Sequence, residues 1–99
     1  MTMPLEGMVV LDTTQVMAGP FCTLLLADMG AEIIKVEQPG VGDMSRRLGP
    51  YFLGEESAYY LGFNRSKKGV TIDLRNPEGR KVFDRLLAVS DVVFDGFRP

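Results

Sequence analysis

Residues 12–40 read DTTQVMAGPFCTLLLADMGAEIIKVEQPG, and this stretch decides the fold class. An apolar run at 8–11 precedes it, a Gly-Pro pair opens an apolar segment inside it, and a second short apolar run lies at 33–36. A short apolar run bounded by polar residues is typical of a strand that is buried on both faces. Strand, helix and strand within roughly 30 residues form a βαβ unit with two parallel strands. The stretch therefore predicts an α/β protein with a parallel, Rossmann-like sheet.

The helix of this unit is predicted to begin at Gly19, with Pro20 at its first position and Gly30 as its carboxyl-terminal cap. Proline is tolerated at that position because its missing N–H would have no partner there, and glycine suits the residue that follows a helix. Between these residues only Thr23 and Asp28 are polar. Since a helix that is apolar nearly all round is buried, we expect another part of the protein to cover it.

Two more strands and one more helix are predicted after this unit. Residues 70–74 alternate apolar and polar side chains, and residues 92–94 form a further apolar run. Between them Asn76 can cap a helix that has Pro77 in its first turn. One apolar stripe predicts that this helix packs on a face of the sheet; it consists of Val82, Phe83, Leu86, Leu87 and Val89.

The remaining long segment, residues 38–57, is rich in glycine and proline and is predicted to be a loop that contacts a ligand. Its aromatic residues, and those just after it, are interpreted as core or subunit interface rather than as a stacking platform. The strand at 92–94 would lack a helix to cover one face. Together with the apolar helix, this predicts that residues 1–99 are the opening part of a larger α/β protein.

Composition excludes several classes of protein. The 99 residues suffice for one domain, and 45% hydrophobic with 24% charged residues is ordinary for a soluble globular protein. No apolar run approaches the roughly 20 residues of a membrane helix, and no basic flank with an apolar run opens the chain, so we expect a cytoplasmic protein without a membrane segment. Cys22 is the single cysteine and histidine is absent, which predicts a packed thiol, no disulfide and no metal site.

Charge distribution bears on the ligand. The net charge of −2 argues against nucleic-acid binding. The segment 46–69 is nevertheless basic, and its cations could either serve a small polyanion or lie in a solvated loop; they are Arg46, Arg47, Arg65, Lys67 and Lys68.

The turn after the first strand lacks the glycine pattern of dinucleotide-binding proteins. Such proteins carry Gly-x-Gly-x-x-Gly there, whereas residues 14–20 contain one glycine, Gly19. Glu37 ends the second strand near the place where an acid would contact a ribose, but alone it does not carry a prediction of NAD binding. A helix start beside the end of the first strand still suits an anion or an adenine nucleotide.

No set of catalytic side chains can be identified from the residues alone. A Ser-His-Asp triad is impossible without histidine. Asp12, Asp28 and Asp43 could each be nucleophiles, but they are better interpreted as a cap, a buried hydrogen-bonding group and a turn residue.

Several motifs that recur in order resemble the amino-terminal part of the family III coenzyme A transferases. They are Leu-x-Gly at 5–7, AGP at 18–20, LADMGAE at 26–32, KVE at 35–37, GDMSR at 42–46, NRSK at 64–67 and NPEG at 76–79. The resemblance covers nearly the whole chain. It implies that residues 1–99 are the amino-terminal portion of a CoA-binding α/β domain, in a larger enzyme whose two subunits interlock as a homodimer.

The resemblance also implies the substrates and the residues that bind them. The enzyme would use acyl-CoA and a small carboxylic acid, with no permanently bound cofactor. The CoA-binding positions implied are Met17, Ala18, Gln38, Ile72, Asp73, Leu74, Arg75, Gly96, Phe97 and Arg98. Met17, Gln38 and Gly96 differ from the residues of formyl-CoA transferase at these positions.

In this family an aspartate attacks the thioester, giving a mixed anhydride and then an aspartyl-CoA thioester. That aspartate lies beyond residue 99 in the family pattern, so no catalytic residue is predicted within this chain. Two alternatives remain open. The same pattern resembles α-methylacyl-CoA racemases, and the chain could also be a non-catalytic CoA-binding fragment; a dinucleotide oxidoreductase is disfavoured by the missing glycines.

Overall fold

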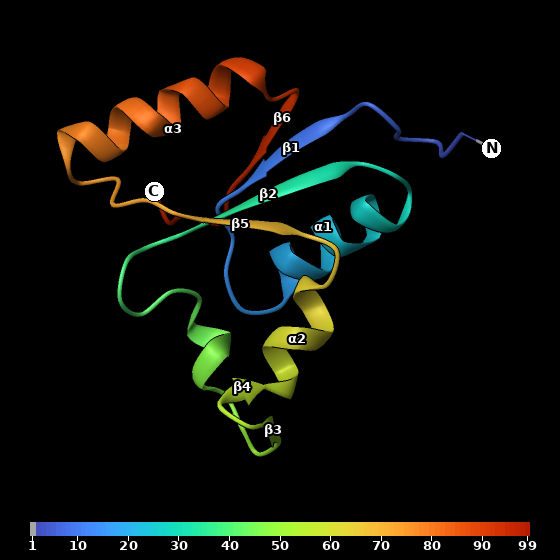
Figure 1. Cartoon of the computed structure of the whole chain (residues 1–99), viewed down its shortest axis with the longest axis vertical. Coiled ribbons are helices and arrows are strands. Elements are labelled where there is room, and N and C mark those ends of the chain that lie inside the picture. The colour runs from blue at the N-terminus through green and yellow to red at the C-terminus, as the bar shows by residue number, and fades with distance from the viewer. Residues whose placement is uncertain (1) are drawn as a thin grey trace.

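A four-stranded sheet with helices on both faces forms the centre of the molecule (Figure 1). The computed structural model describes residues 2–99. Helix α3 lies on one face of the sheet, and α1 and α2 lie on the other (Figure 1). The elements are β1 Val9–Asp12, α1 Ala18–Asp28, β2 Glu32–Glu37, the 3-10 helix η1 Met44–Arg47, β3 Phe52–Leu53, β4 Glu56–Ser57, α2 Ala58–Asn64, β5 Lys68–Thr71, α3 Pro77–Val89 and β6 Val92–Phe94.

All strands of the main sheet are parallel, in the order β5-β2-β1-β6. In chain order these are the third, second, first and fourth strands of the sheet, as in doubly wound nucleotide-binding proteins. The central strand β1 is the best buried, with Val10 and Leu11 both 0% exposed. The predicted parallel α/β fold is confirmed.

The core divides into two clusters because successive side chains of a strand point to opposite faces. On the α1 face, Val10 and Ile33 pack with Leu26 of the helix. On the α3 face, Leu11 and Val36 pack with Phe83, among others. The alternation along β1 and β2 therefore anchors one helix to each face.

Helix α1 begins at Ala18 rather than at the predicted Gly19, so Pro20 occupies its third position. This is harmless, because the N–H groups of the whole first turn have no partner within a helix. Gly30 follows the helix with φ of 104°, which agrees with the predicted cap. Within residues 2–99 the helix is not covered on all sides, since Phe21 and Leu25 are each 45% exposed, so the expectation that another part of the protein covers it stays a prediction.

The segment 38–57 is more ordered than predicted. It contains η1 and a two-stranded antiparallel hairpin of β3 and β4, and α2 follows it directly. The helix α2 was not predicted; the Ser57 hydroxyl caps it by accepting from the Tyr60 N–H at 3.4 Å. Because this hydroxyl also donates to the Leu48 carbonyl, one serine joins η1 to α2.

The predicted strand at 70–74 lies two residues earlier, at Lys68–Thr71. Ile72 still donates to the Glu37 carbonyl, and it remains buried with Leu74 packed beside it, so the apolar alternation reports burial beyond the strand itself. In α3 the Asn76 cap is confirmed, but Val82 and Val89 of the predicted stripe are exposed because only part of the stripe faces the sheet.

Candidate functional site at the carboxyl ends of the strands

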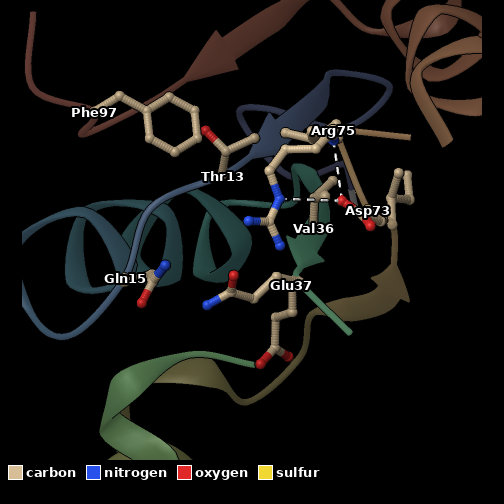
Figure 2. Close-up of a pocket in the computed structure, with 10 residues that line it drawn as sticks. Thr13, Gln15, Val36, Glu37, Asp73, Arg75 and Phe97 are labelled. Carbon is tan, nitrogen blue, oxygen red and sulfur yellow. Dashed lines mark hydrogen bonds and ion pairs between the residues drawn. The ribbon is translucent and has the colours of Figure 1, made fainter. Parts of the chain in front are cut away.

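Two adjoining hollows lie where the strands of the main sheet end. The first, of about 260 Å³, has a floor of buried Val36 and Ile72 and a rim that includes Arg75 and Phe97. The Arg75 side chain extends across the middle of this hollow, between Thr13 and Glu37 (Figure 2). An apolar floor below a cation and several amides suits a flat heterocycle that carries an anionic group.

The second hollow, of about 710 Å³, lies between the segments that follow β1 and β6. Gly96 and Arg98 line one side, and Ala18 and Gly19 of α1 line the other. Strand order reverses between β1 and β6, and open α/β sheets bind ligands at such a point. No side chain within residues 2–99 caps the start of α1, so its first N–H groups are available to an anion.

Most of the site residues expected from the sequence line these hollows. Nine of the ten do so: Ala18, Gln38, Ile72, Asp73, Leu74, Arg75, Gly96, Phe97 and Arg98. The tenth, Met17, is the residue before α1 and is 53% exposed, but it does not line either hollow. Residues from four separate segments of the chain thus meet at one edge of the sheet.

Sequence reasoning missed Thr13, Gln15 and Val36, which also line the first hollow. Thr13 and Gln15 line both hollows, as does Phe97. Their positions could have indicated this role, since Thr13 and Gln15 lie within three residues of the end of β1, and Val36 is the last residue but one of β2.

Asp12 is a structural residue that holds the loop after β1. It is 0% exposed, and its Oδ1 accepts from both the N–H and the hydroxyl of Thr14, at 2.8 and 2.5 Å. Its Oδ2 accepts from the Thr23 hydroxyl at 2.5 Å and lies 3.6 Å from the Lys67 Nζ. Burial lowers the pKa of Lys67 to about 8, although Asp12 partly opposes this shift. A carboxylate enclosed in this way has no access to a substrate.

The other two aspartates are also occupied. Asp43 is 0% exposed; burial would raise its pKa, but hydrogen bonds from Lys35 and from neighbouring backbone N–H groups hold it below the ordinary value. The prediction that Asp28 makes a buried hydrogen bond is wrong. It lies on the exposed side of α1 and pairs there with Arg65 at 2.6 Å.

Glu37, the possible ribose contact, is engaged within the protein. Its oxygens accept from Arg46 Nε and Nη2, each at 2.7 Å, from the Tyr60 hydroxyl at 3.1 Å and from the Asp43 N–H at 2.6 Å. Burial would raise the pKa of Glu37, but these bonds lower it below the ordinary value. Both carboxylate oxygens are used, which removes the remaining support for a dinucleotide site.

The basic residues of the segment 46–69 do not converge on a ligand. Arg46 pairs with Glu37, Arg65 with Asp28 and Lys68 with Glu32. Arg47 and Lys67 donate to the backbone carbonyls of Val41 and Pro20, respectively. The structure therefore favours internal pairing over a polyanion site there, and the cations at the hollows are Arg75 and Arg98.

Within residues 2–99, no group of three or more acidic, histidine or cysteine side chains is arranged to hold a metal ion. No helix in this part of the chain has the length and apolar character needed to cross a membrane.

Comparison with known proteins gives consistent matches along the whole chain. The family model for CoA-transferase family III matches residues 5–99. Human succinyl-CoA:glutarate CoA-transferase is 51% identical over 96 residues, which are 97% of this chain and 22% of the relative. Formyl-CoA:oxalate CoA-transferase of Bradyrhizobium sp. (strain ORS 278) is 43% identical over 99 residues, 100% of this chain and 23% of the relative.

A solved structure gives the same picture of the fold. The crystal structure of a CAIB/BAIF family protein from Brucella suis superposes with a TM-score of 0.89 at 39% identity, covering 98% of this chain and 26% of the other. The chain thus spans about a quarter or less of the length of the relatives it matches.

Proposed function

Since the chain belongs to CoA-transferase family III, we propose that it forms the nucleotide-binding part of a CoA site in an enzyme that transfers CoA from an acyl-CoA to a carboxylic acid. Residues 1–99 would be the amino-terminal portion of its CoA-binding domain. The observation that carries the proposal is the gathering of nine expected contact residues at two adjoining hollows at the carboxyl edge of the sheet.

The chemistry of the hollows supports a division of CoA between them. The apolar floor of the first hollow, Val36 and Ile72, suits the adenine ring, and Arg75 above it suits a phosphate. The start of α1 and Arg98 in the second hollow suit the diphosphate, because N–H groups at a helix start favour negative charge.

Acyl transfer would need a nucleophile from outside these residues. In the family mechanism an aspartate carboxylate would attack the acyl-CoA carbonyl, forming a mixed anhydride and expelling CoA thiolate; the thiolate would then attack the aspartyl carbonyl, forming an aspartyl-CoA thioester and releasing the donor acid. The acceptor carboxylate would attack this thioester to form a second anhydride, and the freed thiolate would attack the acceptor carbonyl, giving the new acyl-CoA and restoring the aspartate. Asp12 and Asp43 are buried and fully engaged, and Asp28 is paired at the surface, so none of the three suits this role.

Binding is tested by calorimetry with CoA on the protein that carries this chain. Arg75→Ala or Arg98→Ala should each raise the Kd about tenfold, which corresponds to about 1.4 kcal/mol, by removing a cation from a phosphate. Arg80→Ala is the matched control, because Arg80 is an exposed arginine of α3 that pairs with Asp84 away from the hollows. Equal affinities of all three variants and the unaltered protein would refute the assignment.

Reaction type is tested separately. Incubation with several acyl-CoAs and a panel of mono- and dicarboxylic acids should yield new thioesters, and hydroxylamine should trap the anhydride. Deuterium exchange beside the thioester without CoA transfer would instead identify a racemase. If the protein binds CoA but catalyses neither reaction, the result would favour the non-catalytic CoA-binding alternative.

The assembly and location implied by the resemblance remain proposals. We propose a homodimer, supported by the exposed apolar residues Phe21 and Leu25 on α1, which a second subunit could cover. Light scattering of the protein that carries this chain measures its mass. The cytoplasmic location stays a prediction.

A further inference from the structure

A buried ion pair lies behind the loop that forms one wall of both hollows. Lys35 of β2 and Asp43 are 1% and 0% exposed, and Lys35 Nζ lies 2.7 Å from Asp43 Oδ2. Lys35 Nζ also donates to the Thr14 carbonyl at 3.1 Å. The pair therefore ties the loop after β1, residues 13–17, to the segment that precedes η1.

Asp43 also holds the conformation of that loop. Its Oδ1 accepts from the Val16 N–H at 3.0 Å and from the Ser45 N–H at 2.9 Å. Val16 has φ of 73°, a left-handed value that is a genuine outlier for a β-branched residue and persists only where surrounding contacts enforce it. Val16 lies two residues before α1 and itself lines the second hollow.

A buried ion pair is not in general required for a stable core. Replacing a buried ion pair with apolar residues of similar size is often neutral or stabilising. Two positions earlier in β2, Ile33 faces the same side of the sheet and packs with α1. The neighbours of Lys35 Nζ are instead the Asp43 carboxylate and the Thr14 carbonyl, so apolar packing does not explain a lysine at this position.

We infer that Lys35, through Asp43, is a positioning residue for the CoA site: it holds residues 13–17 so that Thr13, Gln15 and the start of α1 face the hollows. The inference rests on the proposed function. Preorganised binding groups raise affinity because less motion is lost when the ligand binds.

The test is the double variant Lys35→Met, Asp43→Asn in the protein that carries this chain. Methionine keeps the length of the side chain, and asparagine keeps an oxygen for the N–H groups of both Ser45 and Val16. The variant therefore removes the ion pair and the bond from Lys35 to the Thr14 carbonyl. The double variant should keep a cooperative melt while its Kd for CoA rises about tenfold, equivalent to about 1.4 kcal/mol. Lys68→Met is the matched control, because Lys68 is an exposed lysine of the next strand, and it should bind CoA as the unaltered protein does.

The outcomes separate this inference from the proposed function. A folded double variant with unchanged CoA affinity would overturn the positioning role alone. Failure of the unaltered protein to bind CoA would overturn the proposed function and this inference with it.

If the double variant does not fold, amide hydrogen exchange in the unaltered protein tests the inference instead. The Val16 N–H should be protected without ligand, and the Ala18 and Gly19 N–H groups should become protected only when CoA is added. Rapid exchange of Val16 in the absence of ligand would overturn the inference.

Discussion

Replacing Gly79 with alanine should destabilise the protein, although the same change stabilises most helices. Gly79 is the third residue of α3. A Cβ atom there would overlap the backbone carbonyl oxygen of Asp73 and lie 3.3 Å from Cγ2 of Ile72. The Asp73 carbonyl accepts from the Asn76 N–H at 3.1 Å, so it cannot move without disturbing the turn that starts α3.

Two opposing effects set the change in the free energy of unfolding that Gly79→Ala should cause. Alanine is favoured over glycine within a helix by about 0.8–1 kcal/mol. Overpacking that forces a backbone shift costs about 1–3 kcal/mol, and a backbone oxygen cannot escape by changing rotamer. We therefore expect a net loss of up to about 2 kcal/mol, and for a domain of this size each kcal/mol lowers the melting temperature by about 4–8 °C.

Gly62→Ala is the matched control. Gly62 lies within α2, and a Cβ atom there would have no neighbour within 4 Å. The substitution should therefore stabilise the protein by up to about 1 kcal/mol. Urea unfolding of the two variants and the unaltered protein measures both changes; a stabilising Gly79→Ala would refute the reasoning from the overlap.

Three further changes test the buried groups and the cap of α3. Because burial lowers the pKa of Lys67 from 10.5 to about 8, the unfolded chain binds more protons than the folded one between these values. In urea unfolding, the stability of the unaltered protein relative to that of Lys67→Met should therefore rise between about pH 8 and 10. If this difference in stability fell over the same range, the burial of the Lys67 charge would be contradicted. Glu37, whose pKa lies below its ordinary 4.5 because hydrogen bonds outweigh burial, contributes stability above that pH that is lost as the pH falls through the lowered pKa. Glu37→Gln should flatten the acid limb of a stability profile, and an unchanged limb would count against the Arg46 pairing. Asn76→Ala should cost about 1 kcal/mol by removing the acceptor of the Glu78 N–H, whereas Asn76→Asp should be nearly neutral in thermal melts.

Local patterns predicted the elements whose burial is decided by a few neighbouring residues. The apolar runs identified β1, β2 and β6, and Asn76-Pro77 identified the start of α3. The boundaries of α1 and β5 shifted by one to three residues, because strand ends depend on partners across the sheet. The helix α2 was missed because its cap depends on Ser57, whose hydroxyl is also held by the Leu48 carbonyl of another segment.

The candidate site also has a part that could be expected from the sequence and a part that only the structure shows. Nine of its residues could be proposed from a resemblance along the chain, but not the hollows that they share. Lys35 reads as one more residue of a strand, and its partners lie 8 and 21 positions away in sequence. No periodicity indicates such a contact, since it depends on how two loops meet after the strands have paired.

By itself the sequence determined the class of fold, because burial of short apolar runs and helix capping are properties of adjacent residues. Its ordered motifs identified the family, and the resemblance indicated the expected positions of the candidate site. Only the tertiary structure decided which charges are used internally. Glu37 is taken by Arg46 and Tyr60, Asp12 is enclosed by threonines, and Arg75 and Arg98 line the hollows. The physical reason is that a charge must find a partner when it is buried, and the available partner is set by the packing of distant segments rather than by the residue's own neighbours.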